Sequence, residues 1–278
     1  MSASVLLVVL AGALLHASWN LLIKSGRNTH VSTASIYIGA GALAALTLPL
    51  LPQPARASWP YLGASTATEI LYGALLAAAY RTGDLSHAYP LMRGTAPLLV
   101  AVLSGAVVGE HLSRPLWIGV LLVSGGVVSM IFDARSGKHA RTATRFALLN
   151  AFVIAVYTMI DGVGVRLSGQ PLSYGLWLFA LISGPWLVWS LLRRVHAAGE
   201  WRRQIATGIV GGACSLASYT VALWAMARAP VAAVAAVRET AILFGTVLGA
   251  VVLHERVTWV RALGAVIITA GVLIIRSA

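Results

Sequence analysis

Long apolar runs, separated by short polar segments, follow one another along the whole of this sequence. A helix that crosses a bilayer needs about 20 mostly apolar residues. Because backbone groups in hydrocarbon must be satisfied within the chain, such runs are expected to be helices and the protein to be an all-α integral membrane protein. The pattern predicts ten transmembrane helices, at residues 3–24, 31–51, 59–80, 85–108, 115–132, 146–165, 172–192, 205–226, 231–253 and 257–275.

Composition supports a protein embedded in lipid. Hydrophobic residues make up 59% of the 278 residues and charged residues 10%, with a mean hydropathy of +0.84, whereas soluble domains are about 45–50% apolar and about 25% charged. The net charge of +12 does not indicate nucleic-acid binding, because the basic residues lie between the apolar runs and form no basic stripe. The only cysteine, Cys214, excludes an intramolecular disulfide, and we expect neither a metal nor a cofactor.

A polar segment near the middle divides the chain into two related halves. We predict an N-terminal five-helix repeat at 1–132, a polar linker at 133–145 and a C-terminal five-helix repeat at 146–278. The segments that begin at Arg93 and Arg238 align without a gap at an offset of 238 − 93 = 145, with 11 identities in 39 pairs. An odd number of spans in each half predicts that the two repeats are inverted in the membrane around a central cavity, an arrangement typical of transporters.

The loops after the odd-numbered spans hold thirteen Lys and Arg residues, and those on the other face hold five. The positive-inside rule therefore predicts that the linker is cytoplasmic and that the termini are on the other side.

Seven polar or ionisable residues interrupt the apolar runs, although each ionisable group at mid-membrane costs about 2.5 to 3.5 kcal/mol. They should therefore face one another or a water-filled cavity. Helical spacing places them on shared faces with aromatic residues. The expected substrate-binding residues are His16, Trp19, Asn20, Glu69, Tyr72, Tyr89, Arg93, Tyr157, Asp161, Tyr219, Arg238 and Glu239.

The two arginines suggest how such a site would work. We expect Glu69 or Asp161 to offset one arginine and to leave the other for an anionic group of the substrate, because the guanidinium fork suits carboxylate and phosphate-like groups. The alternative interpretation is that these charges are structural ion pairs that hold the two halves together. Glu69 and then Glu239 are the candidates for proton coupling, because a buried carboxyl group can gain and lose a proton during a cycle.

Other patterns have structural interpretations. Glu110 and Glu255 end the fourth and ninth spans at matching positions, where we expect them to cap or gate the helices at the membrane interface. The Gly-xxx-Gly motifs at 208–212 and 245–249 predict close helix contacts, either within the chain or in a dimer.

The segments VVGEHLS at 107–113 and VLHERVT at 252–258 each lead from a fourth helix into a Gly-rich final helix. Together with the two repeats, they resemble the EamA-type carriers of the drug/metabolite transporter superfamily over the whole chain. The resemblance implies a basket of helices around a central cavity and alternating access by rocking of the halves. The segment LHASWN at 15–20 is also similar to a subgroup that is sometimes linked to phosphonate utilisation.

We therefore expect a secondary transporter of a small polar metabolite, such as an amino acid, an aminophosphonate or a similar anion-bearing solute, in a bacterial inner membrane. No Walker A motif or Ser-nucleophile motif is present, so we expect gradient-driven transport and no enzymatic activity. The expected partners are a small-molecule substrate and membrane lipid, with no nucleic acid, in a monomer or homodimer. The alternative is a lipid-carrier flippase or an assembly partner of another membrane protein.

Overall fold

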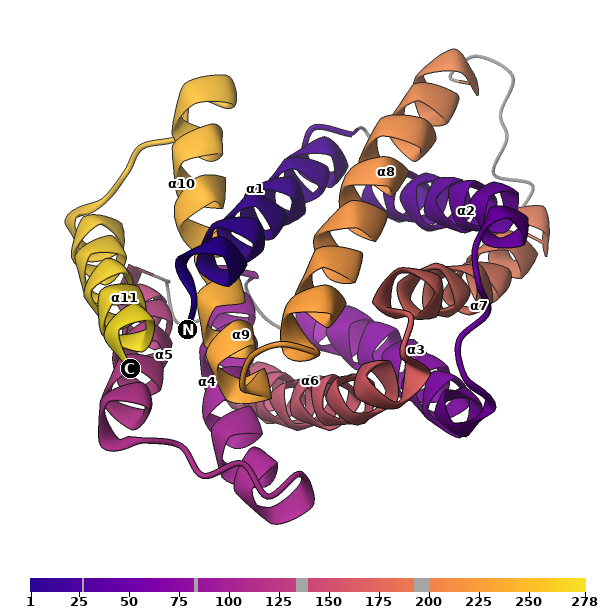
Figure 1. Cartoon of the computed structure of the whole chain (residues 1–278). Helices are drawn as coiled ribbons and strands as arrows, with labels where there is room; N and C mark the ends of the chain where they lie inside the picture. Colours follow the sequence, from indigo (N-terminus) through magenta and orange to yellow (C-terminus); the bar gives the residue numbers. More distant parts are fainter. Residues whose placement is uncertain (27, 83–84, 134–139, 193–200) are drawn as a thin grey trace.

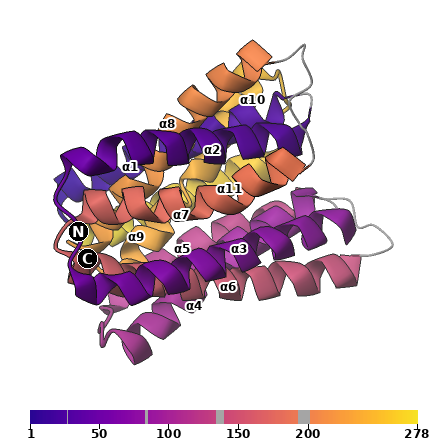
Figure 2. The same cartoon turned by 90° about the vertical axis from the view of Figure 1, so that its right-hand side faces the viewer.

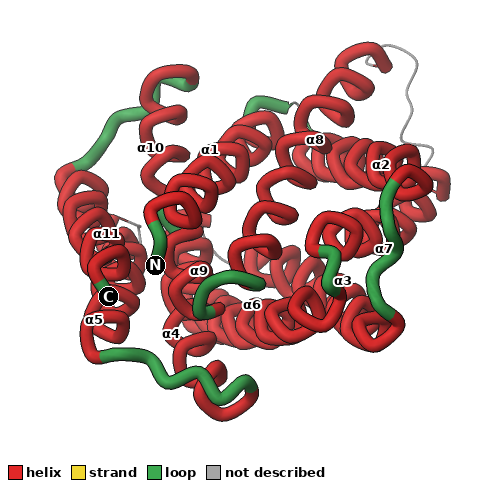
Figure 3. Tube along the Cα trace, viewed as in Figure 1, coloured by secondary structure: helices red, strands yellow, loops and turns green. Residues whose placement is uncertain are grey.

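The computed structural model describes residues 1–26, 28–82, 85–133, 140–192 and 201–278. Figures 1 and 3 show that the described chain consists of helices and connecting loops. The α-helices are α1 (Ala3–Lys24), α2 (Thr29–Thr47), α3 (Trp59–Thr82), α4 (Leu85–Val107), α5 (Arg114–Ser129), α6 (Ala140–Ser168), α7 (Pro171–Leu192), α8 (Trp201–Met226), α9 (Val231–Arg238), α10 (Ala241–Val252) and α11 (Trp259–Ser277). Short 3₁₀ helices occur at η1 (Leu48–Leu50), η2 (Arg56–Ser58) and η3 (Met130–Asp133).

These helices confirm the predicted all-α membrane fold. Within the described residues, nine helical segments are long and apolar enough to cross a bilayer, with α9 and α10 together forming one of them. The remaining predicted span is α3, whose 24 residues give a length of about 36 Å, more than the hydrocarbon core of about 30 Å. It carries Glu69 together with several hydroxyl groups.

The helices run side by side, and both chain termini lie at the same end of the bundle (Figure 2). Helix α1 begins and α4 ends at this end, whereas α10 ends at the opposite one.

Helix packing repeats when the two halves of the chain are exchanged. Helix α1 packs against α8 and α10 of the second half, and the corresponding helix α6 packs against α3 and α4 of the first half. The remaining contacts between halves include three pairs of equivalent helices, α2 with α7, α4 with α9 and α5 with α11. This pattern is the one that two inverted repeats related by a two-fold rotation produce.

Glycines at equivalent positions bring α5 and α11 into backbone contact. A Cβ atom at Gly119 would lie 2.9 Å from the carbonyl oxygen of Gly271, and one at Gly126 would lie 3.0 Å from that of Gly264. The offset of 145 converts the first pair into the second, since 119 + 145 = 264 and 271 − 145 = 126. The Gly-rich final helices therefore cross each other through one symmetric contact.

The turn after the fourth helix of each half has the same backbone hydrogen bond. The carbonyl oxygen of Ser104 accepts a hydrogen bond from the backbone N–H of Glu110 at 3.1 Å, and that of Gly249 accepts one from Glu255 at 3.1 Å. The residue before each glutamate has a left-handed backbone, which is Gly109 with φ 69° in the first turn. The equivalent residue in the second turn is His254 with φ 55°, the one non-glycine residue with positive φ in the described chain.

The predicted span at 231–253 is not one regular helix. At its centre, the backbone N–H groups of Glu239 and Thr240 bond to carbonyl oxygens three residues earlier, at 3.0 Å each, and this tighter turn separates α9 from α10. Both residues keep right-handed dihedral angles, so the helix axis continues through a 3₁₀ turn. Such a turn inside a helix often marks a functional site.

Some predicted boundaries and contacts differ from the structure. Helix α6 begins at Ala140, six residues before the predicted start, and residues 134–139 of the predicted linker lie outside the described residues. The motif at 208–212 makes the close contact that we predicted, because Gly208 and Gly212 lie against the backbone of α2 near Gly39. At the other motif, a Cβ atom at Gly245 would meet no described atom within 4 Å, so this motif makes no close helix contact within the described chain.

The symmetric crossing of α5 and α11 predicts that Gly126→Leu lowers the melting temperature of the detergent-purified protein by several degrees. A Cβ atom there would lie 2.8 Å from Cγ1 of Ile268, and overpacking of this kind costs about 1–3 kcal/mol. The control is Gly125→Leu, because a Cβ atom at that neighbouring position meets nothing within 4 Å. Equal melting temperatures for the two variants would contradict the packing.

The left-handed backbone of His254 predicts that His254→Gly stabilises the protein by about 1 kcal/mol, because glycine adopts this conformation without a Cβ clash. His254→Val should destabilise it, since β-branched residues tolerate positive φ least. Thermal unfolding in detergent measures both variants. His111→Gly serves as the control, because His111 is exposed, has no positive φ and gains nothing from glycine.

Candidate functional site

A buried ion pair joins the two halves where α4 meets α9. Nε of Arg93 lies 3.0 Å from Oε2 of Glu239, and the two residues are only 6% and 4% exposed. We expected Glu69 or Asp161 to offset an arginine, but the acid in contact with Arg93 is Glu239. The 3₁₀ turn explains this choice, because it holds Glu239 at the end of α9 against the middle of α4.

The second arginine has a different environment. The guanidinium group of Arg238 lies over the ring of Tyr219, 4.9 Å from its centroid, and makes no ion pair within the described residues. The hydroxyl group of Tyr219 donates to Oδ2 of Asp161 at 2.5 Å, and that of Tyr174 donates to Oδ1 at 3.0 Å. Asp161 is fully buried. Two tyrosines donate hydrogen bonds to it, and Arg238 lies over the ring of one of them, Tyr219.

Glu69 comes from α3 and faces the same region. It interacts electrostatically with Asp161 and Arg238, but no hydrogen bond or ion pair to it occurs within the described residues. The ring of Tyr72, one turn along α3, meets the ring of Tyr157 from α6 edge to face at 6.0 Å. Both tyrosines interact electrostatically with Glu69, so this carboxyl group lies among aromatic hydroxyl groups.

The predicted site residues of α1 differ in what they contact. The charged residues Glu69, Arg93, Asp161, Arg238 and Glu239 are called the central cluster below. His16 interacts electrostatically with Arg93 and Arg238, and its ring meets the Trp19 indole edge to face at 5.0 Å. The amide of Asn20 donates to the carbonyl oxygen of His16 at 2.7 Å. Asn20 therefore bonds to its own helix, whereas His16 faces the central cluster.

A narrow crevice between α1, α8 and α9 reaches this cluster. His16, Ser218 and Arg238 supply its polar lining, and small or apolar residues supply the rest, including Gly12, Ala13 and Ala222. Tyr89 approaches the cluster from the other side, because it interacts electrostatically with Arg93 and Glu239. Electrostatic or ring contacts thus link every predicted site residue except Asn20 to the cluster directly or through one neighbour.

Two tyrosines of this region were not predicted as site residues. Tyr174 holds Asp161, and Tyr37 interacts electrostatically with Glu69, Tyr72 and Tyr157 while its ring stacks on Trp186 at 5.5 Å. Each stands in an apolar run without a charged neighbour, so helical spacing gave no signal for it. Within the described residues, no three His, Cys, Asp or Glu side chains cluster as a metal site would need.

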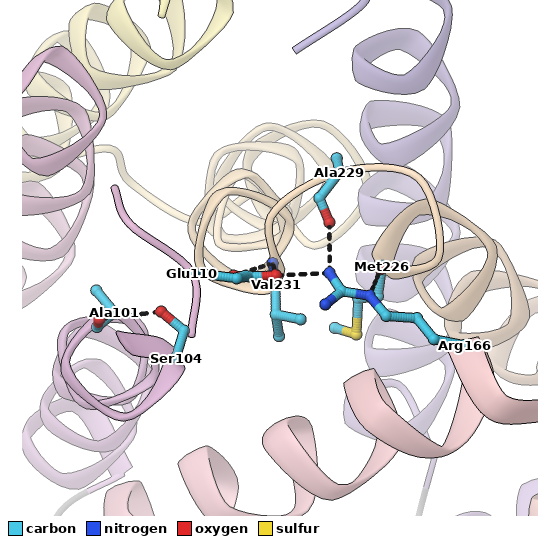
Figure 4. A network of polar contacts seen from close by, with 7 residues as sticks. All are labelled: Ala101, Ser104, Glu110, Arg166, Met226, Ala229 and Val231. Carbon is cyan, nitrogen blue, oxygen red and sulfur yellow. Dashed lines mark hydrogen bonds and ion pairs between the residues drawn. The ribbon is translucent and has the colours of Figure 1, made fainter. Parts of the chain in front are cut away.

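Figure 4 shows a further polar network, which lies beyond the end of α4 and therefore at the end of the bundle that holds the termini (Figure 2). Oε1 of Glu110 lies 2.6 Å from Nη2 of Arg166, and the same carboxylate accepts hydrogen bonds from the backbone N–H of Val231 at 3.0 and 3.3 Å. Arg166 also donates to the carbonyl oxygens of Met226 and Ala229, at 2.9 and 3.1 Å. Glu110 thus joins the first half to α6 and to the loop between α8 and α9.

Comparisons with known proteins agree with this fold. Residues 142–277 match the family model of the EamA-like transporter family. A protein of known crystal structure superimposes with a TM-score of 0.77 and 18% sequence identity, over 99% of this chain and 96% of that chain, which shows a shared fold. No curated protein matches the sequence.

The family match places the chain among multi-pass membrane proteins of a transporter family, whose members take small-molecule substrates and are not enzymes. The resemblance predicted from the sequence is therefore confirmed: residues 142–277 form an EamA-like transporter domain of the drug/metabolite transporter superfamily.

Proposed function

We propose that this protein is a secondary transporter that carries a small polar metabolite with an anionic group, such as an amino acid or an aminophosphonate, across a bacterial inner membrane. Transport would follow alternating access, with the two halves rocking about the central charged cluster. The observation that carries the proposal is Arg238, a cation inside the bundle that lines a crevice and has no ion-pair partner within the described residues.

The repeat explains why the two arginines differ. Arg93 and Arg238 occupy equivalent positions, but Glu239, which neutralises Arg93, corresponds to Gly94, since 239 − 145 = 94. Arg238 therefore has no carboxylate at the position that symmetry would provide. Its guanidinium fork, with His16 beside it in the crevice, suits a carboxylate or phosphonate group of a ligand.

The balance of charge favours a substrate that also carries an amine. The cluster contains three carboxyl groups, Glu69, Asp161 and Glu239, and two arginines, Arg93 and Arg238. Arg93, Asp161 and Glu239 are buried, and Glu69 and Arg238 are half-buried. An anionic ligand alone would add to this negative excess, and uncompensated charge is costly away from water. A zwitterion adds no net charge to the cluster. A proton on Glu69 would neutralise the one remaining negative charge, which supports proton coupling at Glu69.

The 3₁₀ turn at 239–240 also supports a substrate site. Transporters commonly bind their substrates near the membrane midplane, where spanning helices are interrupted. Here the interruption includes Glu239 and directly follows Arg238, so this break in a spanning helix coincides with the charges of the cluster.

A thermal-shift screen against amino acids, aminophosphonates and organic anions tests the anion site. A ligand at 100 times its Kd stabilises the folded state by about 2.7 kcal/mol, so a ligand of the proposed class should raise the melting temperature. Arg238→Ala should remove this rise while leaving the unliganded melting temperature nearly unchanged. Arg93→Ala should lower the unliganded melting temperature itself, because breaking a buried ion pair costs about 3–5 kcal/mol.

The matched control is Arg228→Ala, because Arg228 also lies over an aromatic ring, that of Trp224 at 4.3 Å, but is exposed at a helix end. This variant should keep the full ligand-dependent rise. An undiminished rise in Arg238→Ala would exclude Arg238 as the anion-binding residue.

Proton coupling is tested in proteoliposomes with a ligand found by that screen. A pH gradient should accelerate uptake by the wild-type protein, and Glu69→Gln should abolish this acceleration while ligand exchange between the two sides continues. Glu239→Gln provides the comparison, since it removes the carboxylate that pairs with Arg93 and should therefore destabilise the fold. Wild-type uptake that is indifferent to the pH gradient would remove the coupling hypothesis.

A further inference from the structure

Two ion pairs occupy opposite ends of the bundle and are related by the internal repeat. Glu110 follows the end of α4, at the end of the bundle that holds the termini, and pairs with Arg166 (Figure 4). Glu255 follows the end of α10, at the other end (Figure 2), and pairs with Lys24. The two glutamates are equivalent, since 110 + 145 = 255, and the same turn positions each of them.

The cations of these pairs come from equivalent helices as well. Arg166 lies near the end of α6, the first helix of the second half, and Lys24 is the last residue of α1, the first helix of the first half. In each pair, the acid that follows the fourth helix of one half thus contacts the first helix of the other half. Each pair therefore joins the two halves at one face of the membrane.

The two pairs differ in strength. Glu110 accepts from Arg166 and from the backbone N–H of Val231, while Arg166 is itself held by two carbonyl oxygens. Lys24 and Glu255 make one contact at 2.5 Å, and their side chains are 56% and 33% exposed, compared with 31% for Arg166 and 14% for Glu110. Exposed single pairs contribute little because water and salt screen them.

We propose that Glu110 and Glu255 are the locks of the two membrane faces, and that the unequal strength of these locks makes the protein open more readily at the Glu255 face. This proposal rests on the transport function proposed above, because only alternating access requires that each face opens in turn. The Glu110 lock must release both Arg166 and Val231, whereas Lys24 is the one partner that the Glu255 lock must release among the described residues.

One short helix connects the stronger lock to the central cluster. Helix α9 begins at Val231, which Glu110 holds, and the residue that follows its end is Glu239, which Arg93 holds. Glu110 and Arg93 both belong to the segment of α4 and its following turn. A helix of eight residues is about 12 Å long and transmits movement as a rigid body, so displacement of Glu239 also displaces Val231.

Labelling of a single cysteine from each face tests the locks without a substrate. Cys214 is the only native cysteine, so Cys214→Ser gives a background in which Ser218→Cys reports on the crevice beside Arg238. Intact cells and inverted vesicles expose opposite faces to a membrane-impermeant maleimide. In the background protein, labelling should be faster from the Glu255 face than from the Glu110 face.

Glu110→Gln should accelerate labelling from the Glu110 face by about tenfold, because a charge-assisted hydrogen bond is lost, and should leave the other face unchanged or slower. Lys24→Glu should accelerate labelling from the Glu255 face by only about threefold, as expected for an exposed pair, and Lys24→Glu with Glu255→Lys should reverse this change. Arg166→Gln provides a second test of the stronger lock in case Glu110→Gln fails to fold.

The control is Arg228→Gln, an exposed arginine at the same end of the bundle that follows the end of α8 and whose contacts are to Trp224 of that helix. It should leave both labelling rates unchanged. Equal acceleration from both faces in Glu110→Gln, or acceleration no larger than in Arg228→Gln, would overturn the assignment of locks. These labelling measurements use no ligand. If the thermal-shift screen finds no stabilising ligand, that result counts only against the proposed substrate, and the labelling rates still test the locks.

Discussion

The cost of an unpaired charge in hydrocarbon is the constraint on which the arrangement of this protein depends. Helices satisfy the backbone within each span, but they leave the few ionisable side chains without water. The Arg93–Glu239 pair meets this constraint at the contact between α4 and α9. Because the two residues belong to different halves, the same contact that neutralises the charge also fixes how the halves meet.

The internal repeat supplies a symmetric frame, and the charges depart from it. The crossing of α5 and α11 through Gly119 and Gly271 obeys the offset of 145. The centre does not, since Glu239 corresponds to Gly94, and only one of the two central arginines, Arg93, contacts an acid in the described part of the chain. A symmetric frame suits a molecule that presents two faces in turn, whereas an asymmetric centre allows one orientation of a polar ligand to be preferred.

The sequence was sufficient to predict features that repeat along the chain. Apolar run length located the spans, and the rarity of charge in those runs predicted that Arg93, Arg238 and Glu239 belong to one site. The structure places Arg93 and Glu239 in contact. The partner of Arg93 could not be predicted, because Glu69, Asp161 and Glu239 were all candidates until the packing of α4 on α9 was known. The 3₁₀ turn was equally hidden, since neither Pro nor Gly occurs at 239–240 to mark it.

Other residues show why helical spacing has limits. Asn20 shares a helix face with His16, but its amide bonds to the backbone of its own helix, as short polar side chains often do when no other partner is near. Tyr174 stands in an apolar run and is nevertheless one of the two groups that hold Asp161. Spacing shows which residues can face one direction, whereas hydrogen-bond partners depend on the neighbouring helices.

The position of α9 relates the centre of the molecule to its surface. Its first residue, Val231, is held through its backbone by Glu110, and Glu239 at its other end is held by Arg93. Arg238, the cation without an ion-pair partner in the described chain, is the last residue of the same helix. A ligand that binds Arg238 therefore acts on a rigid segment that is fixed to α4 and its following turn at both ends. Any shift that favours the ligand must be shared between the central ion pair and the contact with Glu110, because eight helical residues leave little freedom to absorb it.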